Sequence, residues 1–186
     1  MSRRTRLVGS LIAGLLLLLA AGGCGRKETP GGGVIARSNR VVPRVARLYF
    51  ESPAMLLVAE QHQLQLSDNP AVALPVVVSE LFKGPATPSL SRSFPPDVVV
   101  RGTYLLPDGT VIVDLGGATL SQGWATGSHQ ELMAVYSLVQ TVVANFTDAK
   151  RVRILINGAP AETLGGHLAL DHSLRPNPAF VDPRAQ

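Results

Sequence analysis

The sequence predicts an α+β fold: a two-layer sandwich in which two helices cover one face of a mixed or antiparallel sheet, in the order ββαββαβ. Three observations lead to this prediction. Apolar residues alternate with polar ones in several short segments, as in half-buried strands. In two longer segments they recur with helical spacing instead. Because two amphipathic helices cannot bury their apolar faces alone, packing both on a sheet is the economical solution.

Two strands and a helix open the predicted domain. The strands are expected at residues 45–50 and 56–66. The helix begins at Asp68-Asn69-Pro70, where a capping residue precedes a proline in the first turn. It ends at Lys83-Gly84-Pro85, with glycine as the cap and proline as the breaker. Pro75 lies inside this helix and predicts either a late start or a kink.

A loop and a hairpin come next. Residues 86–96 hold three prolines and three serines and are expected to form the loop. The hairpin strands are expected at residues 98–106 and 110–115. They are joined by Pro107-Asp108-Gly109, in which proline fixes its φ angle and glycine supplies a positive one.

The second long helix is predicted to begin at Ser128, which forms a capping box with Glu131. A last core strand is expected at residues 151–157 and ends in the turn Asn157-Gly158, after which residues 161–164 can pair back. The buried stripe of the helix is expected to contain Leu132, Val135, Tyr136, Val139, Val142, Val143 and Phe146.

The N-terminus has the features of an export signal. A basic stretch precedes a largely apolar run of 15 residues at 7–21, shorter than the roughly 20 residues that a transmembrane helix needs. The segment from Leu19 to Cys24 resembles a bacterial lipobox, although Ala21 stands where leucine is usual. The resemblance implies diacylglycerol transfer to Cys24, cleavage before it and acylation of the new terminus. An ordinary secretory signal with an incidental cysteine, or a twin-arginine signal at Arg3-Arg4, are the alternatives.

These features divide the chain into four parts. Residues 1–23 are the signal peptide, 24–44 the lipidated N-terminus with a flexible tether, 45–172 the domain and 173–186 a proline-rich tail. The formal net charge is +4, but the basic residues are concentrated before residue 47, and residues 47–172 carry more acids than bases. The positive charge therefore suits export and a membrane-proximal tether, and we expect no nucleic-acid partner. Aromatic residues make up only 5% of the chain, too few for platforms that stack on single-stranded nucleic acid.

Six short motifs occur in order along residues 45–172, about two thirds of the chain. They are Leu48-Tyr49-Phe50, Leu81-Phe82-Lys83-Gly84-Pro85, Phe94-Pro95-Pro96-Asp97, Val111 to Leu115 with Asp114, Gly127-Ser128 with Glu131, and Asn157-Gly158. This ordered set resembles the sporulation and spore-germination domain called GerMN. The resemblance implies a non-catalytic domain of exported envelope proteins, often lipoproteins, whose fold is similar to modules that make protein–protein contacts. It supplies no catalytic residues.

Some side chains were weighed for chemistry or recognition. Asp114, Ser128 and His129, with His167 and His172, could build a hydrolase site, but Ser128 is better explained as a helix cap and no nucleophile elbow exists. His167, His172 and Asp171 could bind a metal. The pattern is weak evidence for a metal site, because it has neither a cysteine partner nor a helical H-E-x-x-H motif. We therefore expect no metal and no cofactor.

Three other residues are candidates for protein interaction. They are Trp124 in a glycine-rich loop, and Arg151 and Arg153 on the polar face of the last strand. For each, the alternative is an ordinary structural place: packing at the sheet edge for Trp124, and a solvated face for the arginines.

The predicted function is that of a non-enzymatic envelope lipoprotein. Its anchor is the lipid on Cys24, and its location is the outer face of the cytoplasmic membrane, or the outer membrane in a diderm. Its partner is an envelope protein or a second copy of the chain. A peptidoglycan- or glycan-binding module is the main alternative, and a hydrolase is the third.

Overall fold

The computed structural model describes residues 39–122, 124 and 127–185, so the predicted signal, Cys24 and most of the tether lie outside the described residues. The first two strands, β1 (Val41–Glu51) and β2 (Leu57–Ser67), pair antiparallel along their whole length as a separate ribbon. Helix α1 (Pro70–Lys83) follows. Its N-cap is Asn69, whose side chain accepts a hydrogen bond from the backbone N–H of Ala71 at 3.1 Å, as its place before Pro70 predicted.

A second sheet forms from the rest of the chain. Strands β3 (Val99–Leu105) and β4 (Thr110–Gly116) make an antiparallel hairpin. Strand β5 (Arg151–Ile156) pairs parallel to β4, and the short β6 (Ala159–Pro160) pairs back on β5. Between β4 and β5 lie the short α2 (Ala118–Ser121) and the long α3 (Ser128–Asn145). Two 3-10 turns, η1 (Pro178–Phe180) and η2 (Pro183–Ala185), end the chain.

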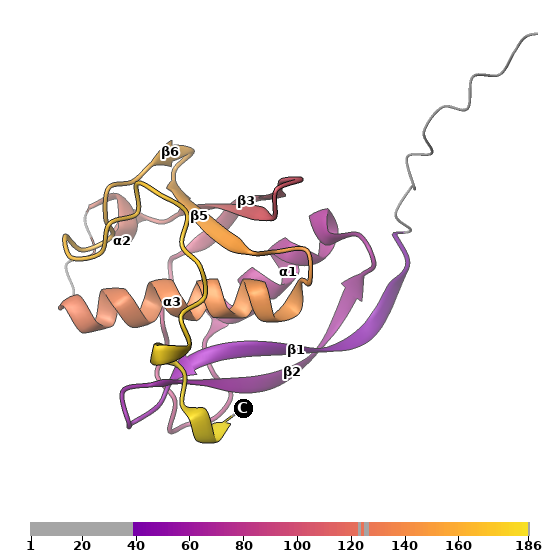
Figure 1. Cartoon of the computed structure of the whole chain (residues 1–186), viewed down its shortest axis with the longest axis horizontal. Helices are drawn as coiled ribbons and strands as arrows, with labels where there is room; N and C mark the ends of the chain where they lie inside the picture. The colour runs from indigo at the N-terminus through magenta and orange to yellow at the C-terminus, as the bar shows by residue number, and fades with distance from the viewer. Residues whose placement is uncertain (1–38, 123, 125–126, 186) are drawn as a thin grey trace, which may run out of the picture. The chain divides into compact units, whose positions relative to one another are not determined.

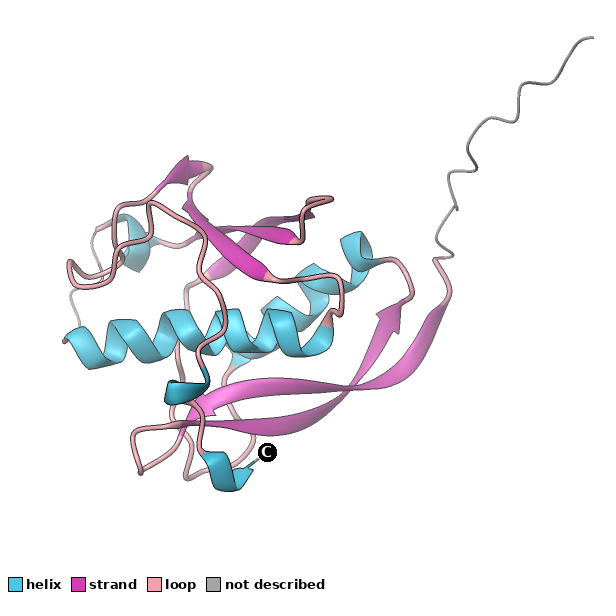
Figure 2. Ribbon diagram, in the orientation of Figure 1, coloured by secondary structure: helices cyan, strands magenta, loops and turns pink. Residues whose placement is uncertain are grey.

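The α+β class is confirmed, but the strands divide into two sheets where the sequence predicted one. Figures 1 and 2 show α3 crossing the middle of the domain, with the β1–β2 ribbon on one side and the sheet of β3, β4, β5 and β6 on the other. A helix on one face of a single sheet would expose its outer face. Helix α3 is instead buried on nearly all sides. Its residues Met133, Leu138 and Val142, for example, are at most 3% exposed.

Polar side chains of α3 take the place of a neighbouring strand at the outer edge of β1. Ser137 donates to the carbonyl of Tyr49 at 2.6 Å, and Thr141 accepts from the backbone N–H of Tyr49 at 3.0 Å. Asn145 accepts from the N–H of Arg47 at 2.9 Å and donates to its carbonyl at 2.7 Å. These three residues recur every fourth position and so lie on one face of the helix. The edge of the ribbon is therefore closed by a helix, which explains why β1 does not join the second sheet.

The ends of the domain differ from the predicted boundaries. Strand β1 begins at Val41, so the last residues assigned to the tether belong to the ribbon. Pro43 is accommodated because its nitrogen, which carries no hydrogen, faces away from β2. Residues 159–160, rather than 161–164, pair back on β5.

The C-terminal segment predicted as a tail packs on the domain. Leu174 exchanges two backbone hydrogen bonds of 2.8 Å with Val152 of β5. Further on, Val181 is buried with Leu57 and Met133 in a small second apolar cluster, and Phe180 contacts Tyr136 of α3 with the two rings tilted by 49°. The segment thus covers one edge of β5 and one side of α3. None of the described helices combines the length and apolar character needed to cross a bilayer.

Replacing Thr141 by valine tests the bond between α3 and β1. Valine keeps the volume of threonine but leaves the Tyr49 N–H without its acceptor in a buried position, so we expect a loss of about 1–3 kcal/mol in the free energy of unfolding. Urea denaturation monitored by circular dichroism measures it. The matched control is Thr147→Val at an exposed threonine, which should change stability by less than about 0.5 kcal/mol. Equal stability of Thr141→Val and the wild type would contradict this role.

Candidate functional site

Trp124 lies at the edge of the core and is half-buried. Its indole stacks on Phe94, with ring centroids 5.9 Å apart and planes at 29°, and Phe94 in turn contacts Phe82 at 4.8 Å. The aromatic row joins the loop before α3 to the end of α1. Trp124 therefore packs on this aromatic row and stays partly exposed, and its role in protein interaction remains a prediction.

Arg151 and Arg153 lie on the same face of β5, as their alternation with Val152 predicted, and each has a local partner. Arg151 donates to the carboxylate of Asp108 at 2.5 Å and to the hydroxyl of Thr110 at 2.8 Å. Arg153 donates to the carbonyl of Asp171 in the C-terminal segment. Both side chains are half-buried. They connect the hairpin turn and the C-terminal segment to β5.

Of the five residues considered for a hydrolase, Asp114 and His129 have partners within the fold, and Ser128 is exposed. Asp114 accepts from the N–H of Gly158 at 2.8 Å and pairs with Arg101 at 3.3 Å. His129 pairs with Glu51 at the end of β1, at 2.6 Å. Ser128 is exposed at the start of α3. Among the described residues no hydrogen bond or ion pair joins Asp114, His129 and Ser128, so they do not form a nucleophile–base–acid chain.

Glu131 is fully buried, and its role differs from the predicted capping box. The N-cap of α3 is Gly127, and no side chain caps this helix. The carboxylate of Glu131 instead accepts from the backbone N–H groups of Leu164, Gly165 and His167, all within 2.9 Å. Burial alone would raise the pKa of Glu131, but these backbone donors outweigh it and hold the pKa below its ordinary value. Glu131 thus fastens the loop after β6 to the start of α3.

The residues considered for a metal do not converge. His167 contributes its backbone N–H to Glu131. His172 and Asp171 pair with each other at 2.8 Å on an exposed loop. Within the described part of the chain, no group of three or more His, Cys, Asp or Glu side chains is placed to hold a metal ion.

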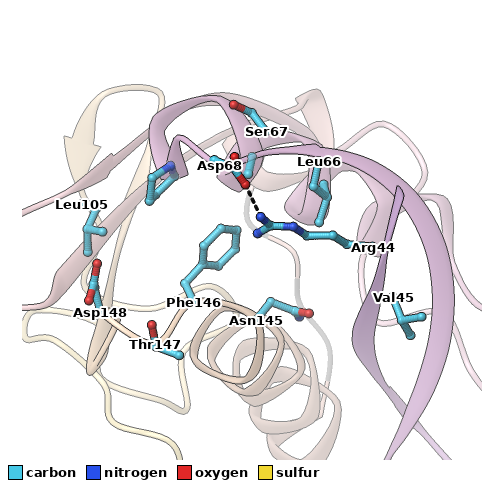
Figure 3. A pocket seen from close by; sticks show the side chains of 12 residues that line it. Arg44, Val45, Leu66, Ser67, Asp68, Leu105, Asn145, Phe146, Thr147 and Asp148 are labelled. Carbon is cyan, nitrogen blue, oxygen red and sulfur yellow. Dashed lines mark hydrogen bonds and ion pairs between the residues drawn. The ribbon is translucent and has the colours of Figure 1, made fainter. Parts of the chain in front are cut away.

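A pocket of about 310 Å³ opens where the ribbon, α1, β3 and the end of α3 meet. Figure 3 shows the ring of Phe146 pointing into it toward the ion pair between Arg44 and Asp68. Both members of that pair are substantially exposed, at 49% and 38% of the side chain, and they neutralise each other. The pocket therefore offers a small mixed surface near the start of β1, without an unpaired catalytic group among the residues that the structure describes there.

A charged cluster that sequence reasoning missed lies between β2 and α1. His62 contacts Glu60 through Nε2 at 2.5 Å and Glu80 through Nδ1 at 3.2 Å, and Lys83 donates to Glu80 at 2.7 Å. The side chains of His62, Glu60 and Glu80 are less than 20% exposed. The alternation of side chains along the strand could have revealed this cluster. Leu64 and Leu66 face the core, and because every second residue of a strand lies on the same face, Glu60 and His62 lie on that face too.

Glu60 is the most strongly perturbed member of this cluster. Burial opposes its ionisation, yet hydrogen bonds from Thr87, Ala86 and His62 lower the pKa of Glu60 from 4.5 to about 2. The two backbone donors belong to the loop after α1. The ionised carboxylate therefore ties this loop to β2, and the cluster acts as a structural fastening rather than as a proton donor near neutral pH.

We expect the Glu60→Gln variant to be less stable than the wild type near pH 7, by at most about 3 kcal/mol. Because the folded-state pKa of Glu60 is depressed, its contribution is complete above about pH 4.5 and is lost as pH falls toward 2. The two proteins should therefore converge in stability under acid. Denaturant titrations at several pH values measure this, with the exposed Glu162→Gln as control. A stability difference that does not change with pH would contradict it.

Comparison with known proteins identifies the family of the domain. A family model described as "Germane: Sporulation and spore germination" matches residues 47–162. No curated protein sequence matches the chain. Among solved structures, the chain is similar to a candidate lipoprotein of Clostridium perfringens, with 14% identity, TM-score 0.52, and coverage of 73% of this chain and 87% of that one.

Two structures of the sporulation protein GerM from Bacillus subtilis are also similar, each with 23% identity. For its first GerMN domain the TM-score is 0.52, with coverage of 70% of this chain and 97% of that one. For its tandem GerMN domains the TM-score is 0.54, and this chain covers 46% of the tandem protein. At these identities the structures support the fold, and the family model, which spans more than half of the chain, identifies the family. The chain belongs to the Germane, or GerMN, family of sporulation and spore germination domains.

Proposed function

We propose that the protein is a lipid-anchored envelope protein whose Germane domain binds other proteins and catalyses no reaction. The observation that carries this proposal is the family match over residues 47–162, read together with the lipobox-like segment that ends at Cys24. The family links the domain to sporulation and spore germination, and a related process of the cell wall is part of the proposal. A lipid anchor with two or more acyl chains would hold it stably at a membrane surface.

The use of the polar side chains supports a non-catalytic domain. Asp114, Glu131 and His129, which would be the natural acids and bases of an active site, each hold a turn, a loop or a strand end. A general base needs a free lone pair within reach of a nucleophile. In the described residues these groups are engaged with donors from the fold itself.

The similar structure from Clostridium perfringens, which is described as a lipoprotein, supports the anchoring step by analogy. In this chain the anchoring depends on Cys24. The tether between Cys24 and Val41 would then keep the domain a short distance from the bilayer.

Replacing Cys24 by alanine tests the anchor. We expect the wild-type protein to incorporate a metabolic fatty-acid label and to sediment with membranes. The variant should lose the label and leave the membrane fraction, because it lacks the thiol to which the lipid would be attached. Thr29→Ala in the tether is the control and should behave as the wild type. A Cys24→Ala protein that keeps the label or the membrane association would contradict the proposal.

Two further experiments distinguish an envelope protein partner from peptidoglycan. In-cell crosslinking followed by mass spectrometry should recover envelope proteins with the wild type. Incubation of the purified chain with cell-wall sacculi should leave it in the supernatant. Recovery with the sacculi and no crosslinked protein would favour a peptidoglycan-binding module instead.

Substitutions at the former hydrolase candidates test the absence of catalysis. We expect Ser128→Ala and His129→Ala to leave the phenotype of the cell unchanged, provided that the protein level is unchanged, because neither group is placed for nucleophilic attack. Immunoblotting controls the level, since His129 pairs with Glu51 and its loss can lower stability slightly. If either variant, at a normal protein level, gave the same phenotype as deletion of the gene, this would contradict a non-catalytic domain.

A further inference from the structure

One edge of the β1–β2 ribbon is open. The ladder continues at both ends, where Asp68 N–H donates to Arg40 and Ser52 N–H donates to Leu56. In this register the even-numbered residues of β2 exchange hydrogen bonds with β1, and the odd-numbered ones direct their N–H and carbonyl groups outward. Leu57, at the start of β2, is covered by Val181 and accepts from Asp182. Within the described residues, no hydrogen bond reaches the outward groups from 59 to 65.

The other edges of the two sheets are protected. Three polar side chains of α3 bind the outer edge of β1. The edge of β5 is covered by β6 and by Leu174. Strand β3 is interrupted by a bulge between Val100 and Gly102, and the charged Arg101 lies there. Proteins commonly protect edges by cover, bulges, charge or proline, since a bare edge pairs with other strands.

From residue 59 to residue 65, strand β2 has no bulge and no proline, and within the described residues no backbone hydrogen bond covers its outer edge. It runs for 11 residues in unbroken register, without proline, glycine or lysine. Its two charged residues, Glu60 and His62, lie on the inner face and pair with each other. The exposed side chains along its open half are the neutral amides of Gln61, Gln63 and Gln65. The edge is thus regular, uncharged and free to accept a strand.

We propose that two copies of the chain associate through β2, antiparallel about a two-fold axis at Gln63, and so form one continuous four-stranded sheet. This inference specifies one partner of the interaction domain and to that extent rests on the proposed function. The pairing sets Gln63 against its own copy and Gln61 against Gln65. These are the residues whose backbone groups point outward, so each pair can exchange two hydrogen bonds.

Side-chain complementarity favours a second copy as the occupant. In this register His62 faces Leu64 of the other copy and Glu60 faces Leu66, so no like charges lie opposite each other. The row of glutamines is self-complementary, since each amide both donates and accepts. A strongly acidic or basic strand would gain no ion pair from this edge. The two-fold arrangement also uses the same residues on both sides, as an isologous interface requires.

The test uses the full-length, lipid-modified chain in detergent. Sedimentation equilibrium in density-matched detergent should give a protein mass of two chains for the wild type. Gln63→Cys treated with a short bis-maleimide should crosslink at least tenfold more than Val45→Cys. Val45 is the matched control, because it is half exposed and lies directly across the ribbon from Gln63 but one strand further from the axis. The wild type controls for any reaction through Cys24.

A charge exchange at the axis gives the decisive comparison. Gln63→Lys and Gln63→Glu should each sediment as one chain, because each would place two like charges in contact, and their mixture should return to two chains. Circular dichroism and thermal unfolding verify that both variants remain folded. Equal crosslinking of Gln63→Cys and Val45→Cys, a dimer of Gln63→Lys alone, or a single-chain mass for the wild type would overturn the inference. Loss of anchoring in Cys24→Ala would leave these masses unaffected, so the two proposals fail separately.

Discussion

The hydrogen bonds between α3 and the outer edge of β1 are the interaction on which the rest of the domain depends. Ser137 and Thr141 are inaccessible to solvent, and with Asn145 they satisfy backbone groups that a strand would otherwise have to pair. Because the helix closes this edge, the ribbon remains separate, and α3 can bury its other faces against α1 and the second sheet. A helix of purely apolar residues would fill the same volume but leave the edge of β1 unpaired in the interior.

The domain uses buried carboxylates in a consistent way. Glu60 and Glu131 lie on regular elements, and each accepts backbone N–H groups from a loop. A carboxylate offers several acceptor sites in a small volume, so one side chain can fix two or three nearby peptide groups. Aspartates do the same at the surface: Asp97 accepts from Thr119 at the start of α2, and Asp114 accepts from the turn at Gly158. The acidic excess of the folded part therefore has a structural explanation.

Local patterns in the sequence predicted the helices and strands, but they did not predict how distant segments pack together. Asn69 before Pro70 located the start of α1, and Asn157-Gly158 located the turn after β5, because capping and positive φ angles depend on a few adjacent residues. The division into two sheets depends on Thr141 and Ser137 meeting β1, a contact between segments some 90 residues apart. Glu131 was assigned to its own helix end because a nearby partner was visible in the sequence, whereas its actual donors lie more than 30 residues away. The family resemblance was recoverable because it rested on the order of local motifs.

The position of β1 also has a mechanical consequence. Under the proposed anchoring, any tension between the membrane and the domain enters the fold at the first residue of this strand. The hydrogen bonds that hold β1 run across its axis on both sides, to β2 and to α3. A force along the strand therefore acts on all of these hydrogen bonds at once, in shear. If β1 were bonded at one edge only and pulled perpendicular to its axis, its hydrogen bonds would break one after another. The described part of the chain therefore begins with a strand that is hydrogen-bonded along both of its edges.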